Sequence, residues 1–237
     1  MHEINFDEFN NILVVAPHAD DETIGCGGIL LTCGYKTDVM LLTDGRKGAP
    51  HGIVVDEEEL ANLRKEEFRK AMVFANIRKT IYLGIPDKEV SNKKKEICQQ
   101  NIKDYDAIFV PNRNEAHKDH IVLYKIFSKM KKKQKAHAKL IEYEIWTPLL
   151  RPNLFVDITQ NMRRKVEMLS FYETQLVARD YVGLCEGLNR YRGALCKMEY
   201  AENYYEQRPV RLRSRIVSLL PDAVVEKIYN ILLTHRR

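Results

Sequence analysis

The chain has 237 residues, of which 45% are hydrophobic, and it carries a formal net charge of +5. This length accommodates one large domain with a substantial core. The positive charge is a mild excess, and its lysine runs lack interleaved aromatic residues, so we expect no nucleic-acid partner. No run approaches the roughly 18 apolar residues that a membrane span needs, and the first residues lack the basic flank and apolar stretch of a signal peptide. We therefore expect no stable membrane insertion.

Five cysteines are scattered along the chain: Cys26, Cys33, Cys98, Cys185 and Cys196. Their number is odd and no two form a Cys-x-x-Cys pair, which argues against a disulfide framework and against a thiolate zinc site. The thiols fit a reducing compartment, so the sequence predicts a cytoplasmic protein. It leaves open whether the chain forms a homo-oligomer.

Short apolar or β-branched runs recur along the first two thirds of the chain, at residues 12–16, 38–43, 80–83, 107–111 and 140–146. The stretches between them are typical of helices or long loops. This alternation predicts an α/β fold with a mainly parallel sheet and helices on its faces.

The clearest predicted helix covers residues 57–75, where Asp56 has the features of an N-cap and three glutamates fill the first turn. Residues 43–56 are rich in glycine and charge, which predicts a mobile loop that could act as a lid over the strand ends. After Asp157 the apolar spacing is helical. A last helical segment within residues 206–237 is expected to pack on the same domain, with contact to a membrane surface as the minor alternative.

Two polar segments follow predicted strands. The first is Pro-His-Ala-Asp-Asp-Glu at residues 17–22, and the second is His-Lys-Asp-His at residues 117–120. Because α/β enzymes bind ligands at the carboxyl ends of their strands, we expect the two segments to meet in one site.

A catalytic zinc site uses three ligands drawn from histidine and carboxylate, with one position left open. His18, Asp21 and His120 can supply that set. Successive side chains of an extended segment point in different directions, so Asp20 is free to act as general base while Asp21 binds the metal. By the same argument His117 faces the developing tetrahedral centre. Asp119 is expected to orient His117 and raise its pKa, which favours an imidazolium that stabilises an oxyanion or protonates the leaving amine.

Glycines at positions 25, 27 and 28 follow the first motif, but they lack the spacing of a dinucleotide-binding or phosphate-binding loop. We interpret them as positions where a helix packs closely behind the site.

These motifs resemble those of the PIG-L or LmbE-like deacetylases, which are written P-H-P-D-D-E and H-x-D-H. The resemblance covers roughly residues 10–205 and extends through Thr-Asp-Gly at 43–45, Leu-Arg-Lys-Glu-Glu at 63–67, Gly-Ile-Pro-Asp at 84–87, Phe-Val-Asp-Ile-Thr at 155–159 and the segment 165–175. It implies a Rossmann-like three-layer sandwich over residues 1–205, followed by a helical extension over residues 206–237.

The resemblance also implies an activity, namely metal-dependent removal of the acetyl group from an N-acetylglucosamine-type sugar or glycoconjugate. It implies Zn²⁺ on His18, Asp21 and His120, with Fe²⁺ as the alternative metal because two histidines and a carboxylate accept both. Arg64 and Asp87 match positions that contact the sugar. This chain departs from the family's pattern at Ala19, where proline is common, and at Arg46, whose charge could favour an anionic sugar substrate.

Two other classes of protein remain open. A non-catalytic sugar- or nucleotide-binding module on a Rossmann-like sheet would need neither Asp20 nor His117. A glycosyltransferase offers no use for a base beside a two-histidine metal site. Stoichiometric metal and acetate release that a chelator stops would distinguish the hydrolase from both.

Overall fold

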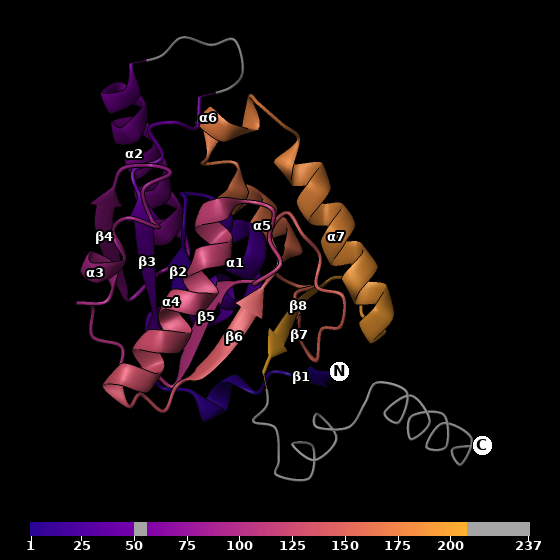
Figure 1. Cartoon of the computed structure of the whole chain (residues 1–237). Helices are drawn as coiled ribbons and strands as arrows, with labels where there is room; N and C mark the ends of the chain where they lie inside the picture. Colours follow the sequence, from indigo (N-terminus) through magenta and orange to yellow (C-terminus); the bar gives the residue numbers. More distant parts are fainter. Residues whose placement is uncertain (50–55, 208–237) are drawn as a thin grey trace, which may run out of the picture. The chain divides into compact units, whose positions relative to one another are not determined.

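The computed structural model describes residues 1–49 and 56–207. Its strands are β1 (His2–Glu3), β2 (Ile12–Ala16), β3 (Thr37–Thr43), β4 (Lys79–Ile85), β5 (Ala107–Pro111), β6 (Lys139–Tyr143), β7 (Leu154–Asp157) and β8 (Ala201–Glu206). Within these residues the strands form one sheet in the order β1-β7-β8-β6-β5-β2-β3-β4 (Figure 1). β2 to β6 run parallel to one another, whereas β8 is antiparallel to both of its neighbours.

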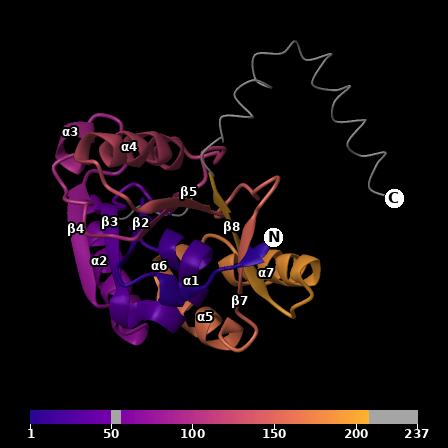
Figure 2. The same cartoon turned by 90° about the horizontal axis from the view of Figure 1, so that it is seen from below.

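The helices of the described residues are α1 (Asp21–Cys33), α2 (Glu57–Phe74), α3 (Lys94–Ile97), α4 (Lys118–Gln134), α5 (Met162–Leu169), α6 (Glu173–Leu176) and α7 (Tyr181–Cys196). They cover both faces of the sheet. In Figure 2, α3 and α4 lie on one side of the strands, and α1, α2, α5 and α7 lie on the other. The resulting three layers confirm the predicted α/β sandwich.

The layers follow from the alternation of side chains along each central strand. In β2, Val14 faces the core shared with α1 and α2, whereas Leu13 and Val15 face the core shared with α4. Successive strand residues point to opposite faces, so a strand that is apolar at every position is buried on both. All five residues of β2 are buried, which explains why its sequence is a continuous apolar run.

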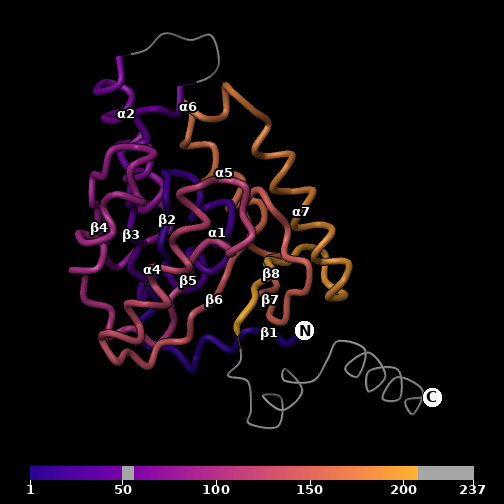
Figure 3. The backbone as a smooth tube through the Cα atoms, viewed as in Figure 1, coloured from indigo at the N-terminus to yellow at the C-terminus, as the bar shows by residue number. Residues whose placement is uncertain are grey.

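The order of the strands positions the candidate site. β2 pairs with β3 on one side and with β5 on the other. The strand order therefore reverses between β2 and β5. The backbone trace of Figure 3 follows the chain from β2 into α1 and from β5 into α4. The loops that leave these two neighbouring parallel strands emerge at the same edge of the sheet, which is where such folds bind ligands.

The predicted strands at 12–16 and 107–111 coincide with β2 and β5, and the predicted helix at 57–75 coincides with α2 to within one residue. The predicted strand at 140–146 was too long, because β6 ends at Tyr143. β1, β7 and β8 were not predicted. Part of the proposed lid, residues 50–55, and the proposed C-terminal extension from residue 208 lie outside the described residues.

Residues Met1–Glu206 form one compact unit. No helix among the described residues is long and apolar enough to cross a membrane. The assignment of residues 1–205 to one domain and 206–237 to an extension stays a prediction.

Candidate metal and active site

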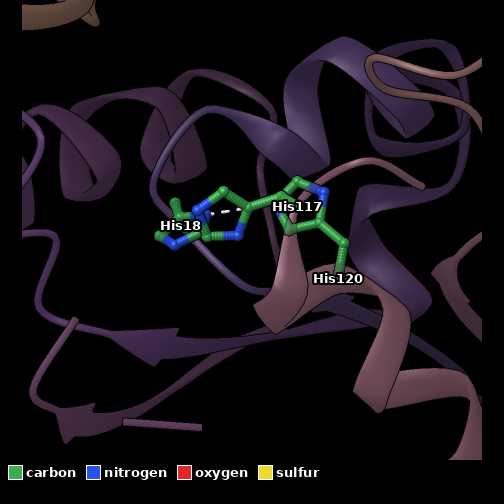
Figure 4. A group of neighbouring side chains, drawn as sticks. All are labelled: His18, His117 and His120. Atoms are coloured by element: carbon green, nitrogen blue, oxygen red, sulfur yellow. Dashed lines mark hydrogen bonds between the residues drawn. The ribbon is translucent and has the colours of Figure 1, made fainter. Parts of the chain in front are cut away.

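The two predicted motifs lie at the starts of two helices that face each other across the sheet edge. Asp20 is the N-cap of α1, so Asp21 is the first helical residue. His117 is the N-cap of α4 and places His120 in that helix's first turn. Figure 4 shows the imidazoles of His18, His117 and His120 gathered in one place, with the first from the loop after β2 and the other two from the beginning of α4.

Three potential ligand atoms converge on one point. The Nδ1 atom of His18 lies 3.2 Å from Oδ2 of Asp21 and 3.2 Å from Nε2 of His120. The Nε2 atom of His120 lies 3.2 Å from the same Asp21 oxygen. Ligand atoms about 2.1 Å from a tetrahedral ion are roughly 3.4 Å apart. The triangle therefore has the size that a single divalent cation requires, and the three side chains are buried.

Two looser sets of ligand atoms lie within 4.8 Å of one another, His18 with His117 and His120, and His18 with Asp87 and Asp119. Both share His18 with the tighter triangle. The mutual 3.2 Å separations bring together His18, Asp21 and His120, the three residues that the sequence analysis chose, more tightly than either of those sets. Their role as metal ligands stays a prediction.

Carboxylates flank the second ring nitrogen of each histidine in this set. The Nε2 atom of His18 lies 3.2 Å from Oδ1 of Asp87 and 3.6 Å from Oδ2 of Asp119. The Nδ1 atom of His120 lies 3.9 Å from Oε2 of Glu115. Carboxylates in this position orient metal-binding histidines and strengthen them as ligands.

Glu115 is held rigidly for such a role. Its Oε1 atom accepts backbone N–H bonds from residues 145, 146 and 147, each 3.1 Å long. Its Oε2 atom and Nδ1 of His120 are buried atoms without a hydrogen-bond partner among the described residues. Buried polar atoms are rarely left unpaired, so a small inward movement of either side chain would complete the pair. We did not predict Glu115, although it lies two residues before the second motif.

The charges of the cluster favour a cation. Burial lowers the pKa of His18, but hydrogen bonds to Asp119, Asp21 and Asp87 outweigh it and hold that pKa well above its ordinary value. Burial would raise the pKa of Asp21, but His120 and His18 hold it far below its usual range. Carboxylates thus surround the ring of His18, and a positive charge at this point is stabilised.

Asp20 has an unusual backbone and an unusual environment. Its φ is +129°, a region that residues other than glycine rarely adopt. Burial and the neighbouring Asp21 carboxylate raise the pKa of Asp20 well above its ordinary value, while Arg64, whose Nη2 lies 3.7 Å from Oδ2 of Asp20, opposes the shift. A carboxylate with a raised pKa is suited to accept a proton near neutral pH.

The environment of His117 differs from the one expected. Burial lowers the pKa of His117, and His18 and His120 lower it further. The expectation that Asp119 raises that pKa above its usual value was therefore wrong. Asp119 does raise this pKa, but burial and the two histidines outweigh it. The Asp119 carboxylate points to His18 and accepts a bond from the Lys88 amide at 3.2 Å. The Asp119 amide donates to Nδ1 of His117 at 3.3 Å, which leaves Nε2 to carry the proton of the neutral ring.

All the predicted site residues except Asp119 and Arg46 line a pocket of about 190 Å³. Arg64 also donates to the carbonyl oxygen of Ala19 at 2.9 Å. Arg46 instead pairs with Asp44 at 2.6 Å outside the pocket, so the structure does not bring it to the site. The residues that the sequence did not single out are Lys47, Gly48, Lys88, Trp146, Gln175 and Tyr181.

Trp146 lies three residues beyond the end of β6. Because ligands bind at the carboxyl ends of parallel strands, this position could have marked Trp146 as a candidate site residue. Gln175 and Tyr181 come from the helical region between β7 and β8. Gln175 ends the segment 165–175 of the resemblance, which could have drawn attention to it, whereas no local pattern indicates that Tyr181 reaches the pocket.

Comparison with known proteins supports the relationship that the motifs suggest. Residues 13–131 match the family described as GlcNAc-PI de-N-acetylase, PIG-L. The diacetylchitobiose deacetylase of Thermococcus kodakarensis is 34% identical over 88 residues, which are 36% of this chain and 33% of that protein. The matched segment thus spans about a third of that relative's length.

Two solved structures share the fold. The N,N'-diacetylchitobiose deacetylase of Pyrococcus horikoshii, in complex with its inhibitor MPG, aligns with a TM-score of 0.71 and 21% identity over 85% of each chain. The 4-carboxy-2-hydroxymuconate hydratase of Pseudomonas putida aligns with a TM-score of 0.67 and 17% identity over 89% of this chain and 98% of the hydratase. One fold therefore serves different reactions, and these likenesses establish the architecture alone.

The family match covers both polar motifs, their strands β2 and β5, and most of α4. It therefore includes every residue of the tight triangle. The chain belongs to the GlcNAc-PI de-N-acetylase (PIG-L) family.

Proposed function

We propose that this protein is a metal-dependent deacetylase that hydrolyses the N-acetyl group of an N-acetylglucosamine-type sugar or glycoconjugate. The observation that carries the proposal is the 3.2 Å triangle of His18, Asp21 and His120 beside the buried Asp20 carboxylate. Family membership and the partial similarity to a diacetylchitobiose deacetylase support this reaction over others that the fold can carry.

The donor set suits Zn²⁺, with Fe²⁺ as the alternative, because two imidazoles and one carboxylate bind both. A cation held by these three residues supplies Lewis acidity toward the amide carbonyl and lowers the pKa of water from 15.7 to about 7. Asp87 and Asp119 would hold the ring of His18, and Glu115 would hold that of His120, each through the nitrogen that faces away from the cation.

The remaining side chains supply the proton transfers. Asp20, with its raised pKa, would take the proton from the attacking water. His117, neutral and protonated on Nε2, would donate a hydrogen bond to the carbonyl oxygen as negative charge develops there. The proton held by Asp20 can then pass to the departing amine, so the base becomes the acid of the second step. Arg64 would keep Asp20 in place through its contacts with that carboxylate and with the Ala19 carbonyl.

The substrate proposed is a small amino sugar or its glycoconjugate. The pocket of about 190 Å³ offers polar groups for sugar hydroxyls and two ammonium groups, Lys47 and Lys88. Either could meet an anionic group on the sugar, a role that the sequence analysis assigned to Arg46. Because Asp87 faces His18, we assign it to orienting that ring in addition to any contact with the sugar.

We also propose a cytoplasmic location, which the five free cysteines support.

The alternative is a non-catalytic sugar- or nucleotide-binding module. Such a module has no use for the raised pKa of Asp20, and it would not hold that residue in a rarely adopted backbone conformation. These two features favour the enzyme.

Acetate release from a panel of N-acetylated sugars, with and without chelator, tests the proposal. We expect acetate from at least one N-acetylglucosamine derivative, loss of release after chelation and recovery when Zn²⁺ or Fe²⁺ is restored. The variant His120→Ala should bind no stoichiometric metal, whereas His137→Ala, at an exposed histidine outside the site, should behave as wild type. Sugar binding that is indifferent to chelator, without acetate release, would instead identify a binding module.

A further inference from the structure

A buried ion pair lies behind the candidate site. Nζ of Lys165, on α5, lies 2.6 Å from Oε1 of Glu202, on β8, and both side chains are buried. The same ammonium group donates to Oδ1 of Asn189, on α7, at 2.9 Å. In Figure 2, α1, α5 and α7 lie on the same side of the sheet. Lys165 thus joins elements that are well separated in the sequence, on the side of the sheet where α1 lies.

Both members of this pair reach the backbone of α1. Nζ of Lys165 donates to the carbonyl oxygen of Ile24 at 2.8 Å, and Oε1 of Glu202 accepts a bond from the amide of Gly28 at 2.8 Å. In a regular α-helix the amide of residue 28 bonds the carbonyl oxygen of residue 24. The ion pair therefore engages both partners of one position in the hydrogen-bond ladder of α1, which restricts sliding and rotation of this turn.

Two glycines allow the ion pair to approach the helix so closely. A Cβ added at Gly27 would lie 2.8 Å from Cγ of Lys165, and one at Gly28 would lie 2.8 Å from Oε2 of Glu202. Larger side chains at these positions would crowd the two partners of the ion pair. Two of the glycines that follow the first motif thus have a specific use, which is to admit Lys165 and Glu202 to the backbone of α1.

The anchored turn of α1 is connected to the candidate site. The amide of Ile24 donates to the carbonyl oxygen of Asp20 at 2.9 Å, and the carbonyl oxygen of Ile24 accepts the bond from Lys165. Asp20 has a rare positive φ, and Asp21 is the first residue of the helix. A shift of α1 along its axis would move both carboxylates relative to His120 on α4.

We propose that Lys165, together with Glu202, is a positioning residue that sets the place of Asp20 and Asp21 through the backbone of α1. The inference rests on the proposed deacetylase function. Stability alone does not account for this pair, because replacing a buried ion pair by apolar residues of similar volume is often neutral or stabilising. Apolar contacts are not directional, so an apolar pair would not fix the orientation of α1 in the same way.

The variant Lys165→Met/Glu202→Gln tests the proposal. It removes both buried charges together, so no unpaired charge is left in the core. The side-chain oxygen of the new glutamine can still accept the bond from the Gly28 amide, whereas the bond from Lys165 to Ile24 is lost.

The matched control is Arg192→Met/Glu144→Gln, at another buried ion pair. The hydrogen bonds of Arg192 and Glu144, to one another and to the backbone of Leu149, do not reach α1. The same chemical change is therefore made away from the helix that carries Asp21.

Metal affinity and turnover are measured on the same preparations, the first by competition for Zn²⁺ with a chromophoric chelator. Misplaced catalytic groups and loosened metal ligands each cost up to about 10²-fold, so we expect the Zn²⁺ dissociation constant of Lys165→Met/Glu202→Gln to rise by about tenfold or more. We expect its kcat at saturating Zn²⁺ to fall by about 10–100-fold, with KM unchanged. The control should match wild type in all three quantities.

A second variant decides the question if Lys165→Met/Glu202→Gln does not fold. The three atoms nearest to a Cβ added at Gly27 all belong to the side chain of Lys165, so Gly27→Ala displaces that side chain and keeps its charge. We expect the same losses of Zn²⁺ affinity and kcat, on the order of tenfold. Gly187→Ala, whose added Cβ has no atom within 4 Å, is the control.

The outcomes separate the two proposals. A wild-type protein that binds no Zn²⁺ and releases no acetate would reject the proposed function. An active wild type, with normal kcat and Zn²⁺ affinity in the folded Lys165 or Gly27 variant, would overturn the positioning role and leave the deacetylase intact. A lower urea midpoint in that variant, without a change in kcat or Zn²⁺ affinity, would also overturn it, because the ion pair would then serve stability alone.

Discussion

Asp20 is held in its rare backbone conformation by two residues behind the site. Its amide donates to Oε2 of Glu22 at 3.3 Å, and Oε1 of Glu22 accepts a bond from the hydroxyl of Tyr172. Glu22 and Tyr172 are both fully buried. Backbone strain of this kind persists only where the surrounding structure enforces it. We infer that Glu22 and Tyr172 position the carboxylate of Asp20.

Replacing Asp20 tests its role as base. The variant Asp20→Asn keeps the shape of the side chain and removes its basicity, so we expect kcat to fall by about 10²–10⁴-fold. Its metal content should equal that of wild type, since the triangle does not include Asp20. Acetate release and elemental analysis of the same preparation measure both. Wild-type turnover in this variant would remove Asp20 from the mechanism.

Replacing Tyr172 tests the positioning network. The variant Tyr172→Phe lacks the hydroxyl that donates a hydrogen bond to Glu22, so the carboxylate of Asp20 is held less firmly in position. Misplacement of a catalytic group by about 1 Å costs up to about 10²-fold in rate, so we expect kcat to fall by about 10–100-fold while KM and metal content stay constant. Tyr35→Phe, at a tyrosine that is 64% exposed, is the control. A Tyr172→Phe enzyme that is less stable but has normal kcat would show a purely structural role.

At this scale the sequence predicted which side chains meet but not how all of them point. His18, Asp21 and His120 could be chosen because strand-end residues of neighbouring parallel strands converge. The direction of the Asp119 carboxylate could not be predicted, because the backbone amide of Asp119 contacts the His117 ring while its side chain turns away from that ring. The carboxylate reaches His18 on another loop instead.

Among the elements, α1 positions Asp21 and packs closely against the sheet. A Cβ added at Gly25 would lie 2.1 Å from Cδ2 of Tyr143, and one at Gly28 would lie 2.2 Å from Cγ2 of Ile158. Neither separation is sterically tolerable. This confirms the interpretation that these glycines permit close helix packing.

Two alanine variants compare a crowded glycine with an open one. Gly25→Ala should lower the free energy of unfolding by about 1–3 kcal/mol, because α1 must shift away from Tyr143. Gly187→Ala, on α7 with no atom within 4 Å of the added Cβ, should raise it by about 0.5–1 kcal/mol through the unfolded-state entropy. Urea unfolding of both variants measures the difference. Equal stabilities would contradict the packing described for α1.

One of the strands missed from the sequence, β8, was missed for a physical reason. β8 carries Glu202 and Asn203 in buried positions, so no apolar alternation marks it as a strand. Glu202 is tolerated there because its Oε1 atom accepts bonds from Nζ of the buried Lys165 and from the Gly28 amide. Lys165 and Gly28 come from distant parts of the chain, and their convergence is a tertiary property. The runs of β2 and β5, by contrast, are apolar throughout and end where the site begins.

For the whole molecule, the proposed metal binding would be coupled to stability. The three ligands come from the loop after β2, from α1 and from α4, so the cation would join segments that are about a hundred residues apart in sequence. A ligand present at 100 times its Kd stabilises the folded state by about 2.7 kcal/mol. A protein of this size gains about 2–4 °C in Tm per kcal/mol.

We therefore expect removal of the metal by a chelator to lower Tm by about 5–10 °C. The variant His120→Ala should show a low Tm that the chelator does not change, and His137→Ala should respond as wild type. Thermal unfolding of the three proteins with and without chelator gives the comparison. A wild-type Tm that is insensitive to metal would show that no cation joins these segments.

We propose that one divalent cation is bound jointly by His18, Asp21 and His120. Anomalous X-ray scattering at the zinc edge, from crystals of the metal-loaded protein, would locate this cation. We expect one strong peak about 2.0–2.2 Å from Nδ1 of His18, Oδ2 of Asp21 and Nε2 of His120. A peak bound by His117 in place of Asp21, or no peak between the two motifs, would contradict it.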